Sequence, residues 1–163
     1  MLRRLFGAFV VAVCLLSTAL FTAEAAKRGE SNQIPTISLQ ELLATIESAQ
    51  GKVVLINYFA TWCPPCKEEI PGLMAIREEF PDESLLIIGL SVDEDMDALR
   101  TYAAKTRFNY PIWVADARVV RWAGVSAIPH LVIFGKDGEL QVNDAGLVPE
   151  DILRDLLKEL MEL

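Results

Sequence analysis

The spacing of apolar residues predicts alternating helices and buried strands from about residue 36 onward. A first helix is predicted where Ser38 can act as an N-cap and Gly51 follows the last turn, with apolar positions on one face at Leu39, Leu42, Leu43 and Ile46. Residues 53–59 are almost continuously apolar, which is typical of a central strand buried on both faces. Cys63 follows this strand by four residues.

The remaining pattern continues this alternation to the C-terminus. We expect a helix from the region of Cys63 to about Phe80, followed by a strand at 85–90, a helix at 95–107, a strand at 110–114, a helical turn at 117–123, and a hairpin of 131–134 with 139–142. A last helix is predicted from near Pro149, with its apolar stripe at Ile152, Leu153, Leu156, Leu157, Leu160 and Leu163. This order predicts an α/β fold with a mixed sheet flanked by helices.

The first residues have the plan of an export signal. Arg3 and Arg4 precede an apolar run over 5–21, and Ala23-Glu24-Ala25 supplies small residues for cleavage. We therefore predict a signal peptide at 1–25, a linker at 26–35 and one domain at 36–163, outside the cytoplasm. An uncleaved membrane anchor is the alternative, because the apolar run is only slightly short for a span.

The net charge and the cysteine content restrict the range of possible functions. The chain has 163 residues and a formal net charge of −8, which argues against nucleic acid, or an anionic membrane surface, as the main partner. Two of its three cysteines, Cys63 and Cys66, are only two residues apart. Closing so short a loop stabilises a fold little, so the pair is better explained by redox chemistry than by a structural disulfide.

A C-x-x-C pair at the start of a helix suits thiol–disulfide exchange. The helix N-terminus favours a thiolate at Cys63, which we expect to be exposed to a partner's disulfide. Cys66, one turn later and more buried, is placed to resolve the mixed disulfide. A closed structural zinc site is disfavoured because it needs four ligands, whereas residues 26–163 hold two cysteines and one histidine.

The segment Phe59-Ala60-Thr61-Trp62-Cys63-Pro64-Pro65-Cys66-Lys67 resembles the active site of thioredoxin-fold proteins, most of all the exported thiol–disulfide oxidoreductases of the TlpA/ResA kind. The resemblance covers roughly residues 35–163. It implies a thioredoxin fold in which residues 85–114 include the extra strand–helix insertion of the TlpA and peroxiredoxin branches.

The same resemblance assigns roles around the cysteines. It implies that Glu69, followed by Pro71, takes part in proton handling, although Glu68-Glu69 could also be a solvated pair. Asn57 stands where cytoplasmic thioredoxins carry a buried aspartate, which places more of the proton transfer on Glu69. The resemblance further implies a cis peptide bond at Pro129 and a substrate-binding surface formed by Trp62, Pro64, Pro65, Ile128 and Pro129.

His130 departs from the family pattern, since a threonine commonly follows the cis-proline. It could tune Cys63 or join a metal site with Cys63 and Cys66, but a strand-edge histidine with no special role is the simpler interpretation.

Together these features predict a thiol–disulfide oxidoreductase that acts on protein substrates and needs no cofactor and no metal. The resemblance implies a reductant, supplied by a membrane thiol carrier and acting for example in the maturation of c-type cytochromes. A copper-binding assembly protein using His130 and a peroxiredoxin-like peroxidase are the alternatives. The peroxidase lacks a separated resolving cysteine.

Overall fold

The computed structural model describes residues 33–162, so the predicted signal peptide and cleavage site lie outside the described residues. These residues form a compact unit from Ile34 onward. Its elements in chain order are β1 (Thr36–Ile37), α2 (Leu39–Ser48), β2 (Val53–Phe59), α3 (Pro64–Glu79), β3 (Leu85–Ser91), α4 (Met96–Thr106), β4 (Ile112–Ala115), α5 (Ala117–Ala123), β5 (His130–Phe134), β6 (Leu140–Ala145) and α6 (Glu150–Glu162).

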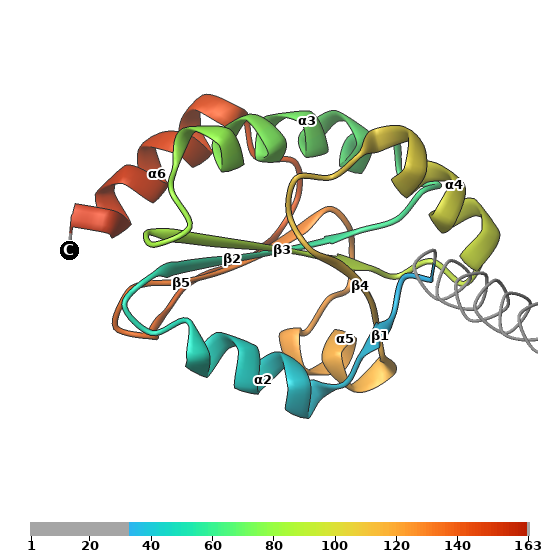
Figure 1. Cartoon of the computed structure of the whole chain (residues 1–163), viewed down its shortest axis with the longest axis horizontal. Helices are drawn as coiled ribbons and strands as arrows, with labels where there is room; N and C mark the ends of the chain where they lie inside the picture. Colours follow the sequence, from blue (N-terminus) through green and yellow to red (C-terminus); the bar gives the residue numbers. More distant parts are fainter. Residues whose placement is uncertain (1–32, 163) are drawn as a thin grey trace, which may run out of the picture. The chain divides into compact units, whose positions relative to one another are not determined.

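The six strands form one mixed sheet in the order β1-β4-β3-β2-β5-β6, as the α/β prediction required. β2 pairs in parallel with β3 and antiparallel with β5, and β6 continues the antiparallel side. Helices α3, α4 and α6 cover one face of the sheet, and α2 and α5 cover the other (Figure 1). Strand β2 therefore lies between two helical layers, which explains why all seven of its residues are buried.

The helices and strands lie close to their predicted positions, with three local errors. β1 was missed because it is only two residues long and is held by parallel pairing with β4 rather than by its own pattern. Leu43 and Ile152 were predicted to face the core and are 42% and 58% exposed. Each lies next to a fully packed leucine, Leu42 or Leu153, that fills the interior at that level.

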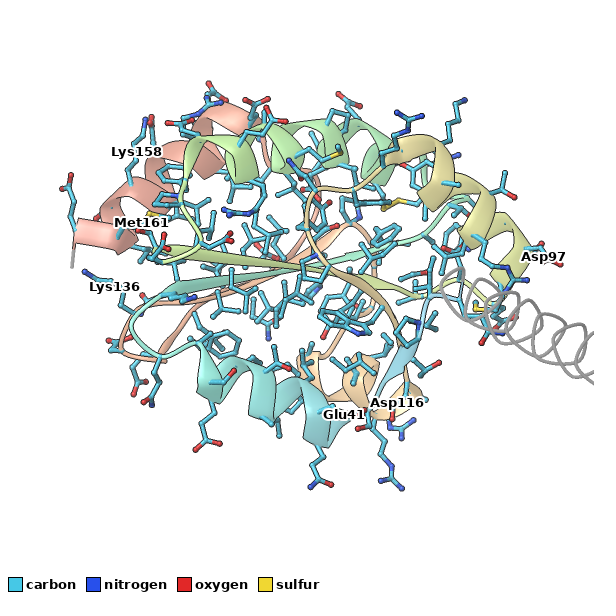
Figure 2. The ribbon with its side chains drawn as sticks, in the orientation of Figure 1. Glu41, Asp97, Asp116, Lys136, Lys158 and Met161 are labelled. Carbon is cyan, nitrogen blue, oxygen red and sulfur yellow. A yellow bond between two sulfur atoms is a disulfide. The ribbon has the colours of Figure 1, made fainter. Side chains whose placement is uncertain are left out.

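Polar contacts fix the C-terminal helix α6 on the sheet and on α3. Lys136, in the turn between β5 and β6, donates from Nζ to the carbonyl oxygen of Met161 at 2.8 Å (Figure 2). The carbonyl groups in the last turn of a helix have no N–H partner within the helix, and this bond supplies a donor to one of them. Arg154 also pairs with Glu79 of α3 at 2.6 Å. No helix among residues 33–162 is both long and apolar enough to cross a membrane.

Gly89 in β3 is predicted to be intolerant of a side chain. A Cβ there would lie 2.8 Å from Ile112 Cγ2 and 3.2 Å from Tyr110 Cε2, both packed against the core. We expect Gly89→Ala to lower the free energy of unfolding by about 1–3 kcal/mol in urea denaturation. Gly72→Ala is the matched control. Its nearest neighbours belong to the Glu150 side chain, and alanine favours a helix, so an equal loss there would contradict the steric argument.

Candidate active site

The two cysteines lie at the first turn of α3, directly after the central strand. Cys63 is the N-cap of this helix, and Pro64 and Pro65 occupy its first two positions. Cys63 and Cys66 form a disulfide with their Cα atoms 5.3 Å apart. The backbone N–H of Cys66 donates to Cys63 Sγ at 3.2 Å. The predictions that a helix starts at the cysteines and that Cys66 lies within bonding reach of Cys63 are therefore confirmed.

Exposure at the disulfide differs from the prediction. Cys66 is fully buried as expected, but Cys63 is only 3% exposed in this oxidised form, so the prediction of an exposed Cys63 is wrong for the disulfide state. In this form Cys63 Sγ is bonded to the fully buried Cys66 and belongs to the same apolar cluster. The adjacent Trp62 is 66% exposed, and Pro64 and Pro65 are also exposed.

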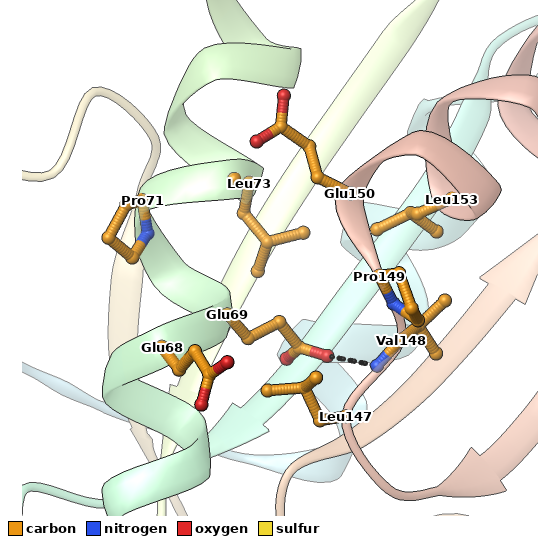
Figure 3. Close-up of a pocket in the computed structure, with 10 residues that line it drawn as sticks. Glu68, Glu69, Pro71, Leu73, Leu147, Val148, Pro149, Glu150 and Leu153 are labelled. Atoms are coloured by element: carbon orange, nitrogen blue, oxygen red, sulfur yellow. Dashed lines mark hydrogen bonds between the residues drawn. The ribbon is translucent and has the colours of Figure 1, made fainter.

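Glu69 lies one turn further along α3, and its side chain is buried between the helix and the sheet. It is 5% exposed, whereas its neighbour Glu68 is exposed, so the interpretation as a solvated pair fails for Glu69. Its carboxylate accepts a bond from Asn57 Nδ2 at 2.6 Å. It also accepts one from the Val148 N–H at 3.3 Å (Figure 3).

Burial raises the pKa of Glu69 from its ordinary value of 4.5 to about 7, although the bonds from Val148 and Asn57 act in the opposite direction. No cation pairs with this carboxylate among the ion pairs of residues 33–162. Desolvation therefore outweighs hydrogen bonding, and the group can hold or release a proton near neutral pH.

Glu69 also borders a pocket between α3 and the start of α6. The pocket has a volume of about 330 Å³ (Figure 3). Its lining residues are Glu68, Glu69, Pro71, Gly72, Leu73, Leu147, Val148, Pro149, Glu150 and Leu153. The segment Leu147–Pro149, which sequence reasoning did not associate with the cysteines, thus supplies both a pocket wall and a backbone donor to Glu69.

The loop before β5 confirms the prediction for Pro129, since the Ile128–Pro129 peptide bond is cis. Pro129 is buried, and the partly buried Ile128 packs against the apolar cluster that contains Cys63 and Cys66. The loop and the disulfide thus belong to one packed region, as the predicted substrate surface requires.

His130 does not join the cysteines. β5 is an interior strand, so His130 is not at the sheet edge, and it is buried at 5% exposure. Its ring packs edge-on against Tyr58, and its Nε2 lies 2.6 Å from Asn143 Oδ1. Tyr58 belongs to the core on the α2 and α5 face, opposite α3, which separates His130 from the cysteine helix. No cluster of three or more potential ligands that could hold a metal occurs within the described part of the chain.

Asp93 is a second feature of this site that sequence reasoning missed, after the segment Leu147–Pro149. It is buried and hydrogen-bonds Thr61, two residues before Cys63. An acidic residue shortly after the predicted buried strand at 85–90 was the available signal. The carboxyl ends of neighbouring parallel strands meet at one edge of a sheet, so this position had to lie near the residues after Phe59.

The mixed sheet, the disulfide at a helix N-terminus, the buried glutamate behind it and the cis-proline loop define a thioredoxin-fold thiol–disulfide oxidoreductase. The chain belongs to the AhpC/TSA family, which matches residues 25–143. Within that family it is of the TlpA/ResA-like kind, as the motif around Cys63 predicted.

Three similar proteins illustrate the relationship. The thiol-disulfide oxidoreductase ResA of Bacillus subtilis is 25% identical over 95% of this chain and 92% of its own length. A thiol:disulfide interchange protein of Chlorobium tepidum has a TM-score of 0.65 at 24% identity, over 71% of this chain and 83% of its own. A secreted disulfide oxidoreductase of Mycobacterium tuberculosis, homologous to DsbE of E. coli, has a TM-score of 0.58 at 26% identity, over 69% and 85% of the two chains.

The raised pKa of Glu69 predicts a pH-dependent loss of stability in the oxidised protein. Between about pH 4.5 and 7 the folded state keeps a proton that the unfolded state has released, so stability falls as pH rises through this window. Relative to Glu69→Gln, which does not titrate, we expect the wild type to lose up to about 3 kcal/mol of unfolding free energy across it.

Urea denaturation of both proteins from pH 4 to 8 measures this difference, with Glu68→Gln as the exposed control. Parallel curves for wild type and Glu69→Gln would show that folding does not raise the pKa of Glu69 above its value in the unfolded chain.

Proposed function

We propose that the protein exchanges a dithiol for a disulfide on protein substrates, with Cys63 as the attacking residue and Cys66 as the resolving one. The observation that carries this proposal is the Cys63–Cys66 disulfide at the N-terminus of α3, with Cys66 fully buried. In the reduced protein the Cys63 thiolate attacks a substrate disulfide, breaks its S–S bond and releases one substrate thiolate. The Cys66 thiolate then attacks Cys63 Sγ, releases the second substrate thiolate and leaves the protein disulfide.

Glu69 is proposed to handle the proton of Cys66. The Cys66 thiol must be deprotonated before it can attack, and its side chain has no exposed surface from which solvent could take the proton. Glu69 lies one helical turn beyond Cys66 and has a pKa of about 7, so it can accept that proton at neutral pH and return it when the disulfide is reduced. Asn57 orients the carboxylate but cannot itself carry the proton.

The substrate surface is proposed to surround the disulfide on its exposed side. Trp62, Pro64 and Pro65 supply exposed, conformationally restricted contacts around the cysteines. Ile128, before the cis bond to Pro129, offers backbone groups for an extended peptide. A peptide held there would bring its own disulfide to Cys63 once reduction had freed Cys63 Sγ from Cys66.

The protein is proposed to work outside the cytoplasm as a reductant, for example on the cysteines of c-type apocytochromes. The N-terminal pattern of residues 1–25, the secreted Mycobacterium tuberculosis relative and the ResA relative support this proposal. Each turnover passes two electrons to the substrate and leaves the Cys63–Cys66 disulfide, which must be reduced again. Because the extracytoplasmic compartment is oxidising, this reduction needs a dedicated source of electrons. A membrane thiol carrier is the proposed source of those two electrons.

Trapping of partners tests the roles of the two cysteines. Cys66→Ala should accumulate mixed disulfides through Cys63, because the resolving step is lost, whereas Cys63→Ala should abolish disulfide reductase activity. Diagonal gels with mass spectrometry identify the trapped bonds, and the double variant is the control. Trapping through Cys66 in Cys63→Ala, with none in Cys66→Ala, would reverse the assignment.

The reduction potential tests the direction of exchange. We expect a value near or below about −250 mV, close to that of thioredoxin, measured in thiol buffers by following Trp62 fluorescence. A value near about −120 mV would instead identify a donor of disulfides and would contradict the cytochrome role.

A further inference from the structure

The loop that leads into the active-site helix is held by a single buried carboxylate from the neighbouring strand. Asp93 is 4% exposed and follows β3 by two residues. It accepts the Thr61 N–H at 2.9 and 3.0 Å through its two oxygens, and the Thr61 hydroxyl at 2.6 Å. The Ser91 hydroxyl donates to its other side at 2.8 Å, and the Asp93 N–H donates back to Ser91 Oγ at 3.0 Å.

No basic side chain accounts for the burial of this acid. Asp93 is absent from the ion pairs of residues 33–162, and the donors found for its carboxylate are the N–H and hydroxyl of Thr61 and the hydroxyl of Ser91. Burying a carboxylate without a cation is costly unless its oxygens are fully hydrogen-bonded. The hydrogen bonds that satisfy the Asp93 carboxylate therefore also hold the segment of Thr61 and the segment of Ser91 in one arrangement.

Those two segments are the chain after β3 and the chain that enters α3. β2 and β3 run in parallel with Phe59 opposite Ser91, and the Val92 N–H still donates to the Phe59 carbonyl at 2.9 Å. Beyond Phe59, Asp93 continues this connection through Thr61. The next turn closes with the Cys63 N–H on the Ala60 carbonyl at 3.2 Å, so the position of Cys63 depends on how Thr61 is held.

The stability of the Cys63 thiolate depends strongly on the position of Cys63, because this helix N-terminus offers few backbone donors. Pro64 and Pro65 have no N–H, so the first donor of α3 is the Cys66 N–H, which lies 3.2 Å from Cys63 Sγ. Other helix N-termini offer several free donors to an anion. Here a small displacement of Cys63 removes the nearest backbone bond that can stabilise its thiolate.

We propose that Asp93 is a positioning residue for thiol exchange: through Thr61 it fixes the turn before α3 and thereby holds Cys63 Sγ on the Cys66 N–H. Asp93 touches neither cysteine in this arrangement and acts through the loop. The inference rests on the proposed role of Cys63 as the attacking thiol.

The test measures the alkylation rate of Cys63 by iodoacetamide between pH 5 and 9, in the reduced full-length protein carrying Cys66→Ala. The peptide that contains Cys63 is followed by mass, which separates it from Cys14. Thr61→Val is the decisive variant because it removes the hydroxyl bond and changes no charge, and Thr61→Ser is its conservative rescue. Asp93→Asn is the second variant, and the exposed neighbour Glu94→Gln is its control for lost charge.

We expect Thr61→Val to slow alkylation at pH 7 about three- to tenfold and to move the pH profile upward, with Thr61→Ser close to the parent. Asp93→Asn should shift the profile in the same direction, and Glu94→Gln should not. A lower unfolding midpoint with an unchanged profile in Thr61→Val would overturn the proposal and leave Asp93 a structural role alone. Faster alkylation in Asp93→Asn together with an unaffected Thr61→Val would also overturn it, since the charge would then act directly.

The parent separates this inference from the proposed function. If Cys63 in the parent reacted no faster than a free thiol, the proposed nucleophile would be wrong whatever the variants did. If the parent reacted rapidly and Thr61→Val matched it, the positioning role alone would fail.

Discussion

Burial of β2 on both faces is the constraint on which the active site depends. β2 is covered by α3 and α6 on one side and by α2 and α5 on the other, and it pairs with β3 and β5 along its two edges, so packing and hydrogen bonds fix its direction and its end point. The chain must therefore leave the sheet at Phe59, beside the end of β3, and turn directly into α3. The disulfide, the cap at Cys63 and the bond between Asp93 and Thr61 all lie at this exit.

The same burial explains the proton chemistry assigned to Glu69. The side chain of Asn57 in β2 faces α3 and lies in the core, so its polar atoms must find hydrogen-bond partners on that helix. Asn57 meets Glu69 there at 2.6 Å, and its other amide atom, Oδ1, has no partner. An amide can donate to an ionised carboxylate through Nδ2 or accept from a protonated one through Oδ1. The Asn57–Glu69 pair thus suits both protonation states of Glu69, which two carboxylates at this distance would not.

Much of this arrangement could be predicted from the sequence because strong local signals carried it. The continuous apolar run 53–59, the cap at Ser38 and the stripe of α6 each determined an element with little help from its neighbours. The motif located the disulfide, and the resemblance located the cis-proline. The predictions that failed all concern contacts between segments that are distant in the sequence. β1 is held by pairing with β4, Cys63 is packed in an apolar cluster with residues distant in sequence, and His130 was misplaced because a sequence does not show which strands become interior.

Pro64 and Pro65, between the cysteines, make the redox chemistry depend on how the loop before α3 positions Cys63. By removing two N–H groups they leave the Cys63 thiolate with fewer helix N-terminal donors, which lowers its stability relative to the disulfide. The Cys66 N–H has the opposite effect, since it donates directly to Cys63 Sγ. A less stabilised dithiol is a stronger reductant, because a stabilised reduced form is what makes an oxidant. Because these two effects act in opposite directions, the balance between them depends on the entering loop, which must hold Cys63 where the remaining donor, the Cys66 N–H, can reach it.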